Sequence, residues 1–153
     1  MELFDLRAAQ GRLHPYFLEL ITDRHAPKRA VLNDWGDGFP DRDGKFALEF
    51  QTTFNSCFWE LYLHAALRDL GATFDFGFSA PDFVCSHPLS PLIVEATIAS
   101  HAAGYQPEWR GDPAAPWTPE VRQAALEYSS VRLANAFSAK LEKYRNGYAL
   151  LPH

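Results

Sequence analysis

The chain has 153 residues, of which 47% are hydrophobic and 14% aromatic, and this composition predicts one folded domain with a hydrophobic core. It excludes an intrinsically disordered chain, which would contain far fewer aromatic residues. The formal net charge of -5 argues against a broad, non-specific DNA-coating surface, because such surfaces are normally basic.

Several features of the sequence indicate the compartment. No apolar run approaches the ~20 residues needed to cross a bilayer, and the N-terminus lacks the basic-then-apolar pattern of a signal peptide. Cys57 and Cys85 are too few for a disulfide framework. We therefore expect a cytoplasmic protein without membrane contact, in which both cysteines are small core residues.

Residues 1–44 are interpreted as an N-terminal extension, and residues 45–153 as the main domain. One short element is expected in the extension, a helix or strand from Leu13 to Thr22. The remainder has the Gly, Pro and Asp content of turns, as in NDWGDGFPDRDGK, and this composition predicts mostly loop.

The segment from Lys45 to Leu70 is predicted to form a single helix, because it contains no Gly or Pro and Gly71 follows in the C′ position. Most of its circumference is apolar, which indicates burial. Glu60 and His64, one turn apart, lie on a polar stripe of this helix. Such a stripe is usually a solvent face. Because the helix leads directly into the strands that follow, Glu60 is a candidate third acid at a site there.

Three strands are predicted next, at Ala72 to Phe78, Asp82 to Cys85 and Leu92 to Ile98, joined by short turns into a meander. A hairpin formed by the last two would bring Asp82 and Glu95 together on one face. Two adjacent carboxylates are costly unless a cation joins them, and Mg²⁺ prefers carboxylate and carbonyl oxygens. The hairpin therefore predicts a divalent metal site.

A second long helix is predicted from Thr118 to about Asn146, with Thr118 as its N-cap and Pro119 at its first position. Arg132 and Lys140 recur at helical spacing on one face of it. This basic face is either directed at a phosphate or simply solvated.

The order of these elements resembles the PD-(D/E)xK nuclease superfamily, which has the restriction-endonuclease-like fold. The resemblance is carried by Glu60 in FWELYLHAALRDLG, Pro81-Asp82 in APDFVC and Glu95 in IVEATIAS, within roughly residues 46–148. The chain looks closest to uncharacterised bacterial members with Glu-Ala-Thr in place of the acid-x-Lys motif. The resemblance implies an α/β (α+β) fold built as a helix, a three-stranded meander and a helix.

The resemblance also implies a metal-dependent nuclease that hydrolyses phosphodiester bonds, with DNA favoured over RNA as the substrate. In that family the acids matching Asp82 and Glu95 hold one or two Mg²⁺ or Mn²⁺ ions. The carbonyl of the residue matching Ala96 often adds a ligand, and the helix acid matching Glu60 completes the site. The metal polarises the phosphoryl oxygen and lowers the pKa of the attacking water.

The sequence departs from the family pattern at Thr97, which stands where the family has its catalytic Lys. Threonine supplies no cation to balance developing charge. Some members carry the Lys on a neighbouring helix, so Lys140 is the candidate for this role and Lys143 the second choice. The alternative is that Lys140 is a solvated surface lysine.

The sequence departs a second time at its C-terminus. The family fold places a further core strand after the last helix, whereas this chain ends at His153. We therefore expect a truncated domain without that last core strand. The open sheet edge and apolar patch left by such a truncation would favour a homodimer.

Two other functions remain open. A relic or interaction domain would keep the fold and the acids but lack activity. A histidine-dependent hydrolase would use His64, His87 and His101, which lie near the acids in sequence but show no HExxH or similar spacing. Cleavage that requires a metal separates the nuclease from both.

Overall fold

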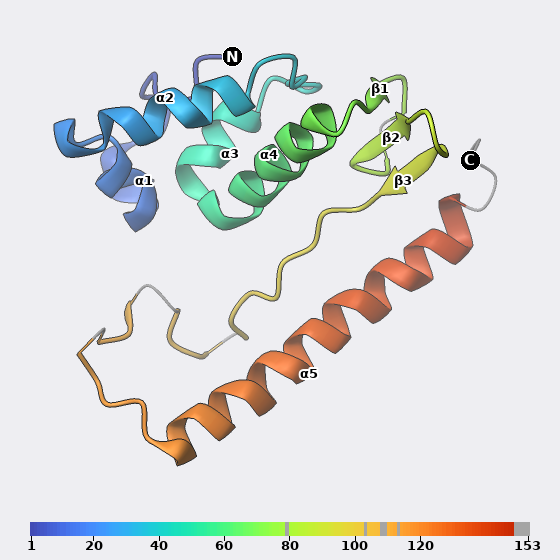
Figure 1. Cartoon of the computed structure of the whole chain (residues 1–153). Helices are drawn as coiled ribbons and strands as arrows, with labels where there is room; N and C mark the ends of the chain where they lie inside the picture. The colour runs from blue at the N-terminus through green and yellow to red at the C-terminus, as the bar shows by residue number, and fades with distance from the viewer. Residues whose placement is uncertain (79, 103, 108–109, 113, 149–153) are drawn as a thin grey trace. The chain divides into compact units, whose positions relative to one another are not determined.

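The computed structural model describes residues 1–78, 80–102, 104–107, 110–112 and 114–148. The chain forms two compact units, one comprising residues 1–96 and the other beginning at Thr97. The first unit is α+β: four α-helices are followed by a three-stranded antiparallel sheet (Figure 1). The second unit contains one long helix.

Residues 1–44 are more helical than the sequence predicts. They contain the 3-10 turn η1 (Gln10–Arg12), α1 (Pro15–Leu20), the 3-10 turn η2 (Asp23–His25) and α2 (Ala26–Trp35). The expectation of loop is therefore wrong over α2. Proline at the second residue of α2 is compatible with a helix, because the first-turn N–H groups have no helical acceptor.

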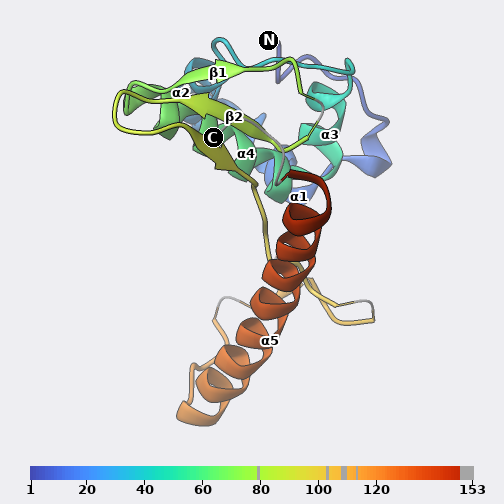
Figure 2. The same cartoon turned by 90° about the vertical axis from the view of Figure 1, so that its right-hand side faces the viewer.

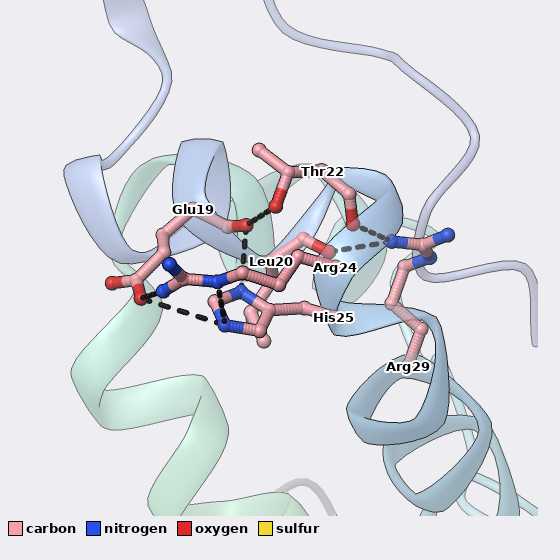
Figure 3. A network of polar contacts seen from close by, with 6 residues as sticks. All are labelled: Glu19, Leu20, Thr22, Arg24, His25 and Arg29. Atoms are coloured by element: carbon pink, nitrogen blue, oxygen red, sulfur yellow. Dashed lines mark hydrogen bonds and ion pairs between the residues drawn. The ribbon is translucent and has the colours of Figure 1, made fainter.

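A network of polar contacts joins α1 to α2 across the turn between them (Figure 3). Nη1 of Arg29 donates to the main-chain oxygens of Leu20 at 2.7 Å and Thr22 at 2.6 Å. The ring Nδ1 of His25 lies 2.9 Å from the main-chain oxygen of Glu19. The Glu19 and Leu20 oxygens belong to the last turn of α1, where carbonyls lack helical partners, and the Thr22 oxygen lies in the turn that follows.

The long helix predicted over Lys45 to Leu70 is divided into α3 (Phe46–Thr52) and α4 (Phe54–Asp69). The division occurs at Thr53, whose φ of -126° and ψ of 45° are not helical. Its hydroxyl donates to the main-chain oxygen of Glu49 at 2.9 Å. Threonine competes for backbone acceptors in this way and is β-branched, so it favours a break between helices.

The end of α4 agrees with the sequence-based prediction. Gly71 has a φ of +83°, the left-handed conformation that glycine adopts without a steric penalty. Its N–H donates to the oxygen of Arg68 at 2.9 Å, and the N–H of Ala72 donates to the oxygen of Leu67 at 3.0 Å. These two bonds form a Schellman motif.

The sheet is the predicted meander, with β2 (Phe83–Ser86) between β1 (Thr73–Asp75) and β3 (Leu92–Val94) (Figure 2). The strands are shorter than the predicted segments. The register pairs Phe74 with Cys85, and Phe83 with Val94. The mixed helix and sheet composition is thus confirmed.

Two groups of buried side chains form the core of the first unit. We call the larger group the helical cluster; it includes Phe4, Phe46 and Phe58 and is centred on Leu3, Phe17, Phe50 and Leu61, each with 0% of its surface exposed. The smaller group, the hairpin cluster, is built on Ala72, Phe83 and Cys85. Phe39 packs against both groups.

Gln51 is a polar residue within this apolar core, with no exposed surface. Its Oε1 accepts the N–H groups of Arg7 and Ala8, and its Nε2 donates to the oxygens of Leu3 and Asp5 at 3.3 and 2.7 Å. One side chain therefore satisfies four backbone groups of the N-terminal segment. The residues before and after position 45 thus share a single core.

The second unit is organised around α5 (Pro119–Lys143), which continues into the π-helical turn η4 (Tyr144–Tyr148). The hydroxyl of Thr118 accepts the N–H of Val121, so the predicted N-cap is confirmed. The hydroxyl of Tyr128 accepts the N–H of Ala102 at 2.6 Å.

Within the described part of the chain, no helix is long and apolar enough to span a bilayer. The missing C-terminal strand concerns residues after 148, which lie outside the described residues.

Candidate functional site

Asp82 and Glu95 flank one end of the β2–β3 ladder. Asp82 immediately precedes β2 and Glu95 immediately follows β3. The last ladder pair is Phe83 with Val94, so the two acids are the first residues beyond that end of the ladder. Both acids are partly buried. The antiparallel hairpin predicted from the sequence is therefore present, with the acids at its open end.

A direct contact fixes Asp82 against the chain that follows Glu95. Oδ2 of Asp82 accepts the N–H of Ala96 at 2.7 Å. A hydrogen bond from a backbone N–H to a carboxylate is short and stronger than one between neutral groups. Ala96 is buried, with 9% of its surface exposed. The contact therefore places the carboxylate of one acid beside the main chain of the other.

Arg42 is a site residue that sequence reasoning missed. It lies in the turn between α2 and α3, and its Nη1 and Nη2 donate to the main-chain oxygens of Phe78 at 2.6 Å and Asp82 at 2.7 Å. The acceptors are 36 and 40 residues away in sequence. The only available signal was an arginine in a turn rich in acids, and that pattern is usual on protein surfaces.

Glu60 lies on α4 and is partly buried. It lines a hollow of about 410 Å³ together with Arg42, Phe46 and Glu49. Among the described residues, no group of three or more His, Cys, Asp and Glu side chains is close enough to hold a metal ion. Asp82 and Glu95 thus lie beyond the same end of the β2–β3 ladder, and the binding of a metal ion by these two acids and by Glu60 stays a prediction.

Lys140 belongs to α5 in the second unit and is partly buried there. Arg132, on the same face, donates its Nε–H to the main-chain oxygen of Ser100 at 2.8 Å. Arg132 is thus engaged in a contact within its own unit. The role of Lys140 as the substitute for the lysine absent at Thr97 stays a prediction.

His64 is a core residue, although it follows Glu60 by one helical turn. Its ring is 1% exposed and packs against Phe74 and Phe39, with centroids 4.7 and 5.2 Å away. Nδ1 lies 3.1 Å from the main-chain oxygen of Trp35, so it carries the proton and donates. Burial lowers the pKa of His64 below its ordinary value.

His87 has a structural role in the turn between β2 and β3. Its Nε2 lies 3.0 Å from the oxygen of Leu70, and its Nδ1 accepts the N–H of Leu89 at 3.2 Å. Both ring nitrogens of His87 therefore contact the main chain, and His64 is in the core. These placements do not favour the histidine-dependent hydrolase.

The two cysteines are buried thiols, as predicted. Burial raises the pKa of Cys57 to about 11 and that of Cys85 above its ordinary value. Because the thiolate is the reactive form, both side chains are inert at neutral pH.

A second hollow, of about 340 Å³, is formed by α1, α2 and α4. It is lined mainly by apolar and aromatic side chains, among them Tyr16, Trp35 and Phe58. Its buried polar residue, His25, already contacts Glu19 and Arg24 (Figure 3). The hollow therefore offers mainly apolar contacts, with Glu19, His25 and Lys28 as its polar lining residues.

Comparison with known proteins finds no match: no protein-family model, no curated protein and no solved structure is significantly similar to the chain.

Proposed function

We propose that the protein is a metal-dependent nuclease of restriction-endonuclease-like fold, in which Asp82 and Glu95 hold a divalent cation. The observation that supports this proposal most is the hydrogen bond from the N–H of Ala96, the residue after Glu95, to the Asp82 carboxylate at the end of the β2–β3 ladder. The helix, three-stranded meander and helix follow one another in the order expected of that fold.

The donor set suits magnesium or manganese. Asp82 and Glu95 supply carboxylate oxygens, and the carbonyl of Ala96 is a further oxygen in the same segment. Mg²⁺ usually keeps several waters and is bound through one or two carboxylates plus substrate phosphates, so a pair is enough. When bound, the ion polarises a phosphoryl oxygen and lowers the pKa of a coordinated water.

The chain's own residues would then bind and orient the reacting groups. The Asp82 carboxylate has two oxygens, so one can accept the Ala96 N–H while the carboxylate also takes part in metal binding. Glu95 contributes the second negative charge. A divalent ion would be held by both charges, because hard cations prefer carboxylate oxygens.

Glu60 and Lys140 have supporting roles in this proposal. Glu60 acts from the hollow that it shares with Arg42, through water rather than as a direct third ligand. Lys140 on α5 contacts the substrate phosphate. DNA is the favoured substrate and RNA the alternative.

The second candidate function is a non-catalytic interaction domain of the same fold. Thr97 in place of the lysine favours it, as does the lack of a three-ligand group among the residues that the structure describes. Such a domain would keep the acid pair without cleaving a phosphodiester.

A cleavage assay with plasmid DNA, single-stranded DNA and RNA, in the presence of Mg²⁺ or Mn²⁺, separates the two functions. We expect metal-dependent cleavage that is abolished by Asp82→Ala and by Glu95→Ala. Asp69→Ala is the matched control, because its side chain is 77% exposed at the end of α4. Lys140→Ala should lower the rate if Lys140 contacts phosphate. Absence of cleavage by the folded wild-type protein would contradict the nuclease and favour the interaction domain.

A further inference from the structure

Arg42 is bonded to the segment that carries the candidate ligand Asp82. Its two terminal nitrogens donate to the main-chain oxygens of Phe78 and Asp82, on the two sides of the Pro81 turn. A planar guanidinium with two fixed acceptors restrains both the distance and the orientation of that segment. The position of Asp82 therefore depends on a residue 40 positions earlier in the chain.

The turn that carries Arg42 is itself anchored to the helical cluster. Oδ1 of Asp41 accepts the N–H of Phe46 at 2.9 Å, and Oδ1 of Asp43 accepts the N–H of Lys45 at 3.1 Å. Both N–H groups lie at the start of α3, where helical acceptors are lacking. Phe46 is a buried member of the helical cluster. The turn that carries the guanidinium is thus bonded to the start of a helix in the helical cluster.

At the other end, Asp82 is fixed at two atoms. Its main-chain oxygen accepts from Arg42 at 2.7 Å, and its carboxylate Oδ2 accepts from Ala96 at 2.7 Å. The first bond restrains the backbone and the second restrains the side chain. Together they define where Asp82 lies relative to the chain around Glu95.

Arg29 and Arg68 make similar contacts elsewhere in the first unit. Arg29 donates to the oxygens of Leu20 and Thr22 in the turn between α1 and α2 (Figure 3). Arg68 donates to the oxygens of Asp34 and Asp37. The acceptors of Arg29 belong to no candidate site, so Arg29 is a matched control for the loss of a guanidinium that joins two carbonyls.

We propose that Arg42 is a positioning residue for metal binding, which holds Asp82 where Asp82 and Glu95 bind one divalent cation together. This inference rests on the proposed function of the acid pair. This role differs from that of the lysine that Thr97 replaces. The guanidinium of Arg42 contacts the backbone of Asp82, whereas the family's lysine acts on the reacting groups. Outer-shell partners that orient a metal ligand typically contribute about 10-fold to 100-fold to metal affinity.

The test is a Mn²⁺ titration of the full chain, followed by the electron paramagnetic resonance signal of free Mn²⁺. Wild type is compared with Asp82→Asn, Arg42→Ala, Arg42→Lys and Arg29→Ala. We expect Asp82→Asn to abolish binding and Arg42→Ala to weaken it about 10-fold to 100-fold. Arg42→Lys should also weaken it, because a lysine keeps the charge but cannot reproduce the two-acceptor geometry. Arg29→Ala should bind as wild type does.

The variants distinguish failure of the positioning role from failure of the metal site. Wild-type affinity in Arg42→Ala, combined with loss of binding in Asp82→Asn, would overturn the positioning role and leave the proposed acid pair intact. Wild-type affinity in Arg42→Lys would also overturn it, because charge alone would then explain the effect. Failure of the wild-type protein to bind Mn²⁺, or binding that Asp82→Asn does not change, would overturn the proposed metal site itself. Circular dichroism shows which variants are folded, and Arg42→Lys serves as the test if Arg42→Ala does not fold.

Discussion

The helical cluster and the β2–β3 hairpin are stabilised in different ways. In the helical cluster, stacked and edge-on aromatic rings surround Phe50, with centroids 5.0 Å from Phe54 and 5.9 Å from Phe4. The acid end of the hairpin depends instead on directional bonds, from Arg42 to the Asp82 oxygen and from Ala96 to the Asp82 carboxylate. Apolar burial stabilises in proportion to the buried area and has no preferred direction. A hydrogen bond, in contrast, fixes the distance and the angle between one donor and one acceptor.

This difference separates stability from function. Substitutions in the helical cluster should change the free energy of unfolding strongly, and affect the acid pair only by unfolding the protein. Substitutions at the acid end should change stability little and metal binding strongly. The predictions that follow test this separation, from the largest expected change in stability to the smallest.

Leu61→Ala should produce the largest loss. Leu61 is fully buried in the helical cluster, and removal of its side chain leaves a cavity among aromatic rings. We expect the free energy of unfolding to fall by about 3 kcal/mol, measured by urea denaturation. Leu70→Ala is the matched control: Leu70 is 70% exposed at the end of α4 and its loss should cost less than about 0.5 kcal/mol. Equal costs would show that the helical cluster is not the main core.

Gln51→Leu should produce the second largest loss. Leucine fills the volume but leaves the N–H groups of Arg7 and Ala8 and the oxygens of Leu3 and Asp5 without their partner. A buried unsatisfied backbone group costs about 1–3 kcal/mol, so a loss of about 2 kcal/mol is expected with partial relaxation. Gln10→Leu, at an exposed position, should be nearly neutral. A neutral Gln51→Leu would contradict the attachment of the N-terminal segment through this side chain.

Because His64 is buried, we expect the protein to lose stability in mild acid. Burial lowers its pKa in the folded protein below the ordinary 6.5, so the unfolded chain binds the proton more tightly. Neighbouring Arg68 lowers the pKa further, while the Trp35 carbonyl and Asp37 oppose the shift. The free energy of unfolding therefore keeps its full value above about pH 6.5 and decreases as the pH falls below that value. Urea midpoints between pH 7.5 and 5.5 should fall less in His64→Asn than in wild type. An unchanged dependence in His64→Asn would contradict the assignment.

Glu95→Gln should produce the smallest change in stability. Glu95 is partly buried just after β3 and belongs to neither cluster of the core. We expect the free energy of unfolding to change by less than about 1 kcal/mol in the presence of a chelator, and Mn²⁺ binding to be lost. A large destabilisation would show that Glu95 has a structural role. The acid end of the hairpin would then stabilise the fold, as the helical cluster does.

Local signals in the sequence predicted much of the fold. The C-terminal end of α4 and the start of α5 follow from Gly71 and Thr118, whose conformational and capping preferences act within a few residues. The three strands follow from short apolar runs separated by turns. The break at Thr53 was missed because a threonine within an apolar run is compatible with either a continuous helix or two helices.

The long-range polar contacts were beyond sequence reasoning. Gln51 and Arg42 have partners 36 to 48 residues away, and neither residue type identifies its acceptor. The helix α2 was missed because HAPKRA reads as loop, although a proline in the first turn is compatible with a helix. For the site, the apolar runs predicted the antiparallel hairpin that carries Asp82 and Glu95 at its end, whereas the ligand roles of Asp82, Glu95 and Glu60 stay predictions.

The most direct test of the central claim is the rate of Mg²⁺-dependent DNA cleavage by wild type, Asp82→Asn, Glu95→Gln and the double variant. If the two carboxylates act as one metal site, each single substitution should reduce the rate to the level without enzyme, and the double variant should show no further loss. Cleavage that persists in either single variant, or losses that simply add in the double variant, would contradict the account.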